Sequence, residues 1–174
     1  MICRGFPPVV GRNPRVLILG SMPGRESLRL RQYYAHPRNA FWDVMALITG
    51  VSKTAPYALR CEGLRRVGVA LWDVCRRCVR KSSLDSDIKQ PESNDFVSFF
   101  KDFPSIHTVV FNGATAERLF HRLVAPVLWT TECPITLLRA PSTSPANARM
   151  SVADKISVWQ KLLTNRLGDA CQAP

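Results

Sequence analysis

Val16-Leu17-Ile18-Leu19-Gly20-Ser21-Met22-Pro23-Gly24 is the stretch of this 174-residue chain that decides its fold. Its first four residues are apolar and rich in β-branched types, which predicts a strand buried on both faces, as in a parallel sheet. The two glycines and the proline that follow predict a tight loop whose backbone comes close to a ligand. The loop matches neither the P-loop pattern nor the dinucleotide-binding pattern of glycines.

Three further apolar runs predict strands, and segments with helical spacing separate them. We expect strands over residues 67–74, 107–111 and 135–138, and helices over 41–48, 95–103, 114–123 and 148–165. This alternation predicts an α/β fold, namely a three-layer α/β/α sandwich with a central, mainly parallel four-stranded sheet. We expect a single domain over residues 1–174, with a core from about 14 to 165 and frayed ends.

The chain carries a net charge of +11, from 24 Lys and Arg against 13 Asp and Glu, and arginine supplies most of the excess. A solubilising surface would account for this charge, and so would a nucleic-acid partner whose phosphates match the guanidinium group. No apolar run approaches the roughly 18 residues that span a bilayer, and the first residues lack the apolar core of a signal peptide. We therefore expect a cytoplasmic or chromosome-associated protein without a membrane partner.

Six cysteines occur in the chain, and Cys75 and Cys78 form a lone C-x-x-C motif. No second pair of Cys or His follows at zinc-finger spacing. We interpret the thiols as structural and expect neither a metal nor a cofactor.

Four loops leave the predicted strands at the same edge of the sheet, beginning at Gly20, Asp73, Asn112 and Ala140. In open parallel sheets, ligands bind beyond the carboxyl ends of the strands. The side chains of these loops should therefore meet in one cleft.

The segment 32–42 combines paired aromatics, an imidazole and an amide directly after the first loop. Phe41 and Trp42 open a predicted helix, where packing alone would explain them. Tyr33 and Tyr34 precede the helix in a loop, where an aromatic face could stack on a flat base.

These blocks closely resemble the hypoxanthine-DNA glycosylases, or DNA-deoxyinosine glycosylases, a branch of the uracil-DNA glycosylase superfamily. The resemblance spans about residues 14–165 and rests on residues 20–24, 27–28, 32–42, 71–74 with 83–88, 111–113 and 141–146. Ala35-His36-Pro37 with Asn39, Phe41 and Trp42 is also similar to the mismatch-specific uracil-DNA glycosylases, a sister group.

The resemblance implies a monofunctional DNA glycosylase of base excision repair. Such an enzyme flips a deaminated base, here hypoxanthine first of all, out of the duplex and hydrolyses its N-glycosidic bond. The implied partner is DNA that contains deaminated bases, and we expect the protein to act as a monomer without a cofactor.

Met22 stands where related uracil glycosylases place a water-activating Asp, Asn or Glu, and a thioether cannot orient water. The resemblance implies Asn39 as the catalytic residue instead, positioning water through its carbonyl oxygen while charge stabilisation lowers the barrier. A plain helix N-cap remains the alternative role for Asn39.

The base-binding residues that the resemblance implies are Tyr34, Asn112, Ser21, Met22 and His36. Tyr34 would stack on the flipped base, and Asn112 would read the donor–acceptor edge that hypoxanthine and uracil share. Asn112 could instead be a turn residue before Gly113. His36 would either donate a hydrogen bond to the base or brace its own loop.

The residues expected to contact the DNA strand are Ser142, Thr143, Ser144, Pro145, Ser83 and Arg77. The hydroxyls and main-chain amides of the first three suit phosphate binding. Several relatives carry a large apolar wedge in this loop, but here only Pro145 and Ala146 are available. The wedge therefore stays unassigned.

Other interpretations stay open at this point. Asp73, Asp85 and Asp87 could form a paired-carboxylate site. The chain could act on uracil or on mismatches, or it could be a non-catalytic sensor of DNA lesions, which would tolerate the loss of Asn39. A small-molecule α/β enzyme would bind DNA only weakly and without preference for a lesion.

Overall fold

A computed structural model of the chain describes residues 1–128 and 135–168. Its centre is a parallel sheet in the order β3-β2-β6-β7. These strands are β2 (Val16–Gly20), β3 (Val69–Asp73), β6 (Thr108–Asn112) and β7 (Thr136–Ala140). The predicted four-stranded parallel sheet is confirmed, and β2 lies in its interior.

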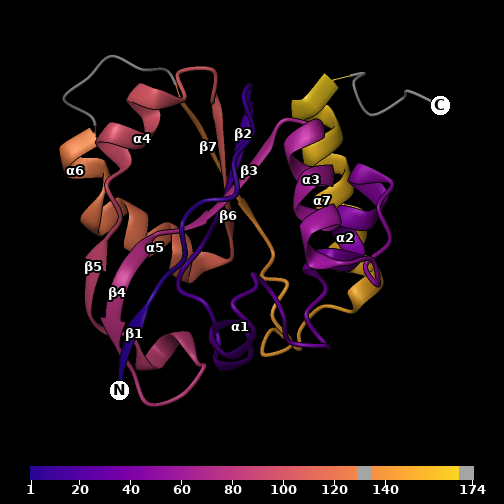
Figure 1. Cartoon of the computed structure of the whole chain (residues 1–174). Coiled ribbons are helices and arrows are strands. Elements are labelled where there is room, and N and C mark those ends of the chain that lie inside the picture. Colours follow the sequence, from indigo (N-terminus) through magenta and orange to yellow (C-terminus); the bar gives the residue numbers. More distant parts are fainter. Residues whose placement is uncertain (129–134, 169–174) are drawn as a thin grey trace.

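Helices cover both faces of this sheet (Figure 1). One layer holds α2 (Phe41–Thr49), α3 (Tyr57–Arg66) and α7 (Val152–Leu167). The other holds α4 (Phe96–Asp102), α5 (Ala114–Leu123) and α6 (Ala125–Leu128). The short helix α1 (Arg25–Leu30) lies beyond the carboxyl end of β2. The arrangement is the predicted three-layer α/β/α sandwich.

The core explains why β2 reads as an unbroken apolar run. Every residue from Val16 to Leu19 has zero solvent exposure, because helices pack on both faces and strands pair on both edges. Phe41 and Trp159 are equally buried in the layer of α2 and α7, and the tilted rings of Phe111 and Phe120 pack together on the opposite side. Removing this apolar surface from water is the main source of stability.

A second, antiparallel sheet in the order β1-β4-β5 differs from the expectation. It comprises β1 (Ile2–Arg4), β4 (Cys75–Val79) and β5 (Lys89–Ser93). The N-terminus, expected to be frayed, pairs with β4, where Cys3 lies opposite Cys78 and both are buried. These short strands are mostly polar, so their sequence lacks the alternation that would have predicted them.

The final helix begins later than expected, at Val152 rather than near residue 148. The Ser151 hydroxyl accepts a hydrogen bond from the Asp154 amide at 3.1 Å and caps the helix there. The segment 141–151 therefore remains a loop. Helix α3 was not predicted, because its charged sequence shows little hydrophobic periodicity.

Cys3, Cys61, Cys75 and Cys78 are buried free thiols. Cys133, Cys171 and the expected frayed C-terminal tail lie outside the described residues. In the part of the chain that the structure describes, no helix is long and apolar enough to cross a membrane.

Ile18→Ala tests the core. Ile18 is fully buried in β2, between β3 and β6, so the substitution should lower the free energy of unfolding by about 2–5 kcal/mol. Denaturant titration measures this change. Leu47→Ala on α2, where the side chain is 54% exposed, is the matched control and should change stability by less than about 0.5 kcal/mol. Equal effects of the two substitutions would contradict the described core.

Candidate functional site

A cavity of about 760 Å³ opens at the carboxyl end of the parallel sheet. Gly20, Asp73 and Asn112 line it, and these residues end β2, β3 and β6. The loop after β7 completes the wall with residues 142–147. The predicted convergence of the four loops on one cleft is thus present in the structure.

All but one of the candidate site residues line this cavity, namely Asn39, Tyr34, Asn112, Ser21, Met22, His36, Ser142, Thr143, Ser144, Pro145 and Ser83. The exception is Arg77 on β4, whose guanidinium donates to Glu92 of β5 at 2.6 Å. Its contact with DNA stays a prediction.

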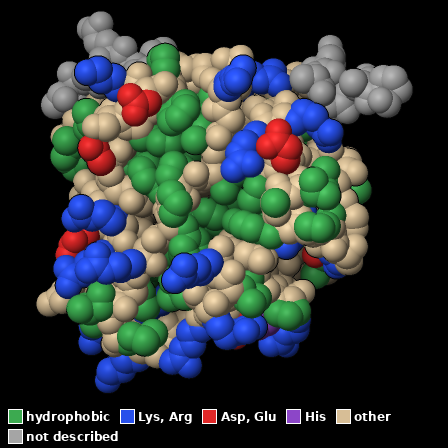
Figure 2. Space-filling model, in the orientation of Figure 1, with side chains coloured by type: hydrophobic (Ala, Val, Ile, Leu, Met, Phe, Trp, Pro, Cys, Tyr) green, Lys and Arg blue, Asp and Glu red, His purple; other side chains and the backbone are tan. Residues whose placement is uncertain are grey.

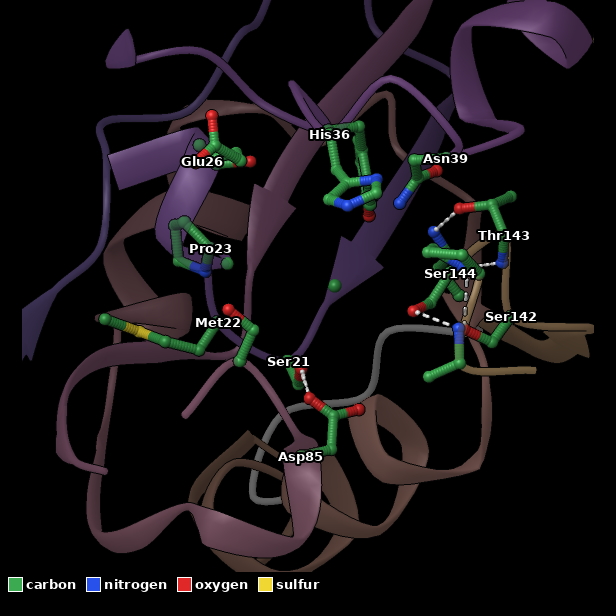
Figure 3. A pocket seen from close by; sticks show the side chains of 18 of the residues that line it. Ser21, Met22, Pro23, Glu26, His36, Asn39, Asp85, Ser142, Thr143 and Ser144 are labelled. Atoms are coloured by element: carbon green, nitrogen blue, oxygen red, sulfur yellow. Dashed lines mark hydrogen bonds between the residues drawn. The ribbon is translucent and has the colours of Figure 1, made fainter. Parts of the chain in front are cut away.

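Asn112 and Thr143 form a two-point clamp, two hydrogen bonds between one pair of residues, at the wall of the cavity. Figure 3 shows Thr143 beside Ser142 and Ser144 on this wall. The Thr143 amide donates to Asn112 Oδ1 at 2.8 Å, and Asn112 Nδ2 donates to the Thr143 hydroxyl at 2.9 Å. A main-chain N–H can only donate, so this contact fixes which side of the Asn112 amide carries oxygen. These two bonds use both polar atoms of the Asn112 side chain, the acceptor Oδ1 and the donor Nδ2, on the same side of the amide group. A bidentate contact with a base, as predicted from the sequence, therefore requires Thr143 to give way.

The clamp extends to the start of α2. The Ala40 amide donates to the carbonyl oxygen of the buried Thr143 at 3.1 Å. Asn39 lies directly before, and its Oδ1 accepts from the Phe41 amide at 3.0 Å. Helix α2 has Ala40 at its N-cap position and no side-chain cap, so this bond is a local turn contact just before the helix and not the plain N-cap that was left open. It leaves Oδ1 one lone pair. In Figure 3 the Asn39 side chain lies beside His36 at the cavity wall.

Tyr34 presents an aromatic ring to the cavity. Its other face stacks on Phe41, with centroids 4.0 Å apart and planes at 21°. Its backbone has φ of 54°, in the left-handed region that a bulky residue adopts only under constraint. Burial, with the charge of Asp73 nearby, raises the pKa of the Tyr34 hydroxyl. The ring is thus held between the core and the pocket.

His36 braces its own loop and keeps a donor. The Arg38 amide donates to His36 Nδ1 at 3.2 Å. Nδ1 must then hold a lone pair, so the neutral ring carries its proton on Nε2. The two roles considered for His36 are compatible.

The loop after β2 is tied to the segment after β4. Ser21 Oγ donates to Asp85 Oδ1 at 2.6 Å, and the Arg25 amide donates to Ser83 Oγ at 3.0 Å. Met22 lines the cavity but is largely buried, and its side chain packs with the hydrophobic core. In Figure 3 its thioether extends away from Asn39.

Asp73 is a buried carboxyl at the cavity floor that sequence reasoning treated only as one of three acids. Burial raises its pKa to about 8, the negative charge of Asp85 adds to the shift, and Arg80 opposes it. Asp85 lines the same cavity, whereas Asp87 does not. Asp73 directly follows an apolar run at the end of a strand. This position was the signal in the sequence that could have marked its carboxyl as buried.

Helix α7 holds the loop after β7 in place. Lys155 Nζ donates to the carbonyl oxygens of Ser144 and Asn147 at 3.1 and 2.8 Å. Trp159 Nε1 donates to the Pro141 carbonyl at 2.8 Å. Both side chains are buried, so sequence reasoning had no motif by which to find them.

Lysine and arginine side chains gather along the lower edge of the view in Figure 2, the end of the molecule where α1 lies in Figure 1. Phosphates can approach such a rim favourably. Among residues 1–128 and 135–168, no group of three or more His, Cys, Asp or Glu side chains could hold a metal ion.

Residues 7–163 match the profile described as the Uracil DNA glycosylase superfamily. The chain belongs to this superfamily. A protein from Methanosarcina acetivorans named Hypoxanthine DNA glycosylase is 35% identical over 161 residues, which cover 92% of this chain and 97% of that protein. One of the same name from Methanosarcina barkeri is 44% identical over 112 residues, 63% of this chain and 70% of that protein.

The superfamily fold is also seen in a solution NMR structure from Methanosarcina acetivorans that is named for the uracil DNA glycosylases. It matches with a TM-score of 0.76 and 34% identity, over 94% of this chain and 99% of that chain. The family resemblance inferred from the sequence is therefore confirmed. The individual residue roles stay predictions.

Lys155→Met tests the support of the loop after β7. Losing two hydrogen bonds from a charged donor should lower the free energy of unfolding by about 2 kcal/mol and loosen residues 144–147. Denaturant titration measures the loss of stability, and steady-state kinetics should show a raised KM for the DNA substrate. Lys161→Met, on an exposed position of the same helix, is the control for charge. The assignment fails if both variants behave alike.

Asp73→Asn tests the buried acid. Between the ordinary pKa of 3.8 and about 8, the folded protein holds a proton that the unfolded chain has lost. The free energy of unfolding should therefore fall as pH rises through this window, by up to about 1.4 kcal/mol per pH unit. Asn cannot titrate, so the variant should lack this slope. Denaturant titrations of both proteins at pH 5 and pH 8 measure the difference, and parallel curves would contradict a neutral Asp73.

Proposed function

We propose that this chain is a monofunctional DNA glycosylase that removes deaminated bases, hypoxanthine first of all, as a step of base excision repair. The observation that carries the proposal is the convergence of Tyr34, Asn39 and Asn112 on one cavity of about 760 Å³. Two relatives named Hypoxanthine DNA glycosylase support the choice of base.

The cavity suits a base that has left the helical stack. A flat base entering beside Tyr34 would meet an aromatic ring whose far side already rests on Phe41, so stacking requires no further ordering of the ring. The His36 Nε2–H can donate to a carbonyl oxygen of the base. While Thr143 stays bonded to Asn112, the Asn112 side chain can make a single hydrogen bond to the base. Once the two bonds to Thr143 break, it can make a bidentate contact.

The reaction replaces one bond to the sugar by another. The C1′–N bond breaks and its electron pair leaves with the base, while a water oxygen bonds to C1′ and gives up a proton, which the departing base anion takes up. Asn39 would orient this water through the remaining lone pair of Oδ1. An amide is too weak a base to take the proton, so the role is positioning, and an oxocarbenium-like transition state makes that sufficient.

A lyase step is not part of the proposal. Strand cleavage through a Schiff base needs a lysine near C1′, and the cavity wall contains none among the described residues. We also propose that the enzyme works as a monomer, in the cytoplasm or on the chromosome. The lysine and arginine side chains at the end of the molecule where α1 lies would contact the DNA phosphates.

A uracil-specific enzyme is the second candidate. Uracil offers the same donor–acceptor edge as hypoxanthine, and the matching NMR structure is named for uracil DNA glycosylases. Cavity size alone does not exclude the smaller base, so the experiment below compares both.

Asn39→Ala tests the proposal on labelled duplexes that carry one hypoxanthine, uracil or xanthine, in EDTA, with hot alkali to reveal abasic sites. We expect wild-type cleavage at hypoxanthine and a loss of at least about 100-fold in the variant, because water is no longer positioned. Gln160→Ala, an exposed amide on α7, is the control and should keep full activity.

Cleavage mainly at uracil would retain the reaction but move the chain to the second candidate. Lesion binding that survives in both proteins without any abasic site would indicate a non-catalytic sensor and refute the enzyme.

A further inference from the structure

Two buried polar atoms without a hydrogen-bond partner lie at the floor of the cavity. They are Asp73 Oδ2 and the hydroxyl oxygen of Tyr34. Both side chains converge on Gly20, where a Cβ would collide with Asp73 Oδ1 and lie 2.9 Å from the Tyr34 hydroxyl. Only glycine leaves room for this approach. Buried polar groups are nearly always paired, so two neighbouring exceptions call for a role.

The surroundings of Asp73 do not supply a counterion. Arg80 is a buried cation whose charge lowers the pKa of Asp73. Among the described residues it forms no ion pair with Asp73: its Nη2 donates to the Pro23 carbonyl, and its Nη1 has no hydrogen-bond partner. The other titratable groups that face Asp73 are Asp85, Tyr33, Tyr34 and Cys75. None of these adds a positive charge, so the geometry favours a carboxyl that keeps its proton.

We propose that Asp73 is a positioning residue that carries a proton in the working enzyme, and that this proton allows it to form a hydrogen bond to the Tyr34 hydroxyl oxygen that the two unpaired side chains do not make as they stand. The inference rests on the proposed function, because it concerns how the base-stacking ring is held. The Tyr34 ring already rests on Phe41, and a bond at the hydroxyl fixes its remaining freedom to tilt.

The protonation state decides where the single hydrogen of the Tyr34 hydroxyl points. When Asp73 is neutral, its O–H donates to the tyrosine oxygen, and the hydrogen of the buried tyrosine hydroxyl points away from Asp73, on the side of Asn112. When Asp73 is ionised, the carboxylate accepts the tyrosine hydrogen, and the side of Asn112 loses a donor. The new negative charge also lies beneath a base that departs with an electron pair, so both effects lower the rate.

The test measures kcat and KM of wild type and Asp73→Asn on hypoxanthine duplexes from pH 6 to pH 9.5. Asn keeps the shape and a donor at every pH. We expect the wild-type kcat to fall about tenfold per pH unit above about 8, while the variant does not follow. The base has its own alkaline ionisation, which affects both enzymes alike and cancels in their ratio.

Two further measurements do not depend on that variant. The carboxyl carbon of Asp73, followed by NMR in the wild-type protein, should titrate well above the ordinary range of an aspartate. Tyr34→Phe keeps the ring and removes the hydroxyl. At pH 7 it should lower kcat, and adding Asp73→Asn to it should cause no further change.

The outcomes separate this inference from the proposed function. An active wild type whose rate ratio to Asp73→Asn stays constant with pH, or an Asp73 that titrates near 4, overturns the inference alone. A wild type that releases no base at any pH overturns the proposed function and this inference with it.

Discussion

The hydrogen-bonded clamp between Asn112 and Thr143 is the constraint on which the site depends. It joins the end of β6 to the loop after β7 through two contacts of 2.8 and 2.9 Å, and the Thr143 carbonyl continues it to Ala40 at the start of α2. Three segments that are distant in the sequence thereby share one buried threonine. Asn39 and Asn112 face the same cavity because this one residue holds both of their segments.

Two glycines make the close approach possible. Gly113 has φ of 95°, and a Cβ there would lie 2.8 Å from the Cβ of Ser142, so the clamp could not close over any other residue. Gly20 leaves the space into which Asp73 and Tyr34 project. The backbone at the sheet edge is thus as much a part of the site as the side chains that line it.

The chemistry that this site can perform follows from the absence of a strong base among the groups that would orient water and base. The amide of Asn39 and the neutral His36 can orient water and base, but neither is a strong base beside the sugar. Under the proposed function, such a site would accelerate hydrolysis by placement and by a floor that carries no charge, and the basic side chains near α1 would hold the phosphates. Met22 fits this scheme, since its position serves the hydrophobic core.

The sequence by itself determined the parallel sheet, the loop 20–24 and the segment 32–42, because burial on both faces and turn chemistry leave local patterns. It also indicated Tyr34, Asn39 and Asn112, through a resemblance that local motifs carry. Only the tertiary structure decided that Thr143 holds Asn112, that Lys155 supports the loop after β7, that Asp73 and Tyr34 both approach Gly20, and that the N-terminus pairs with β4. These contacts join residues far apart in the chain, and a hydrogen bond across such a separation leaves no periodicity or spacing in the sequence.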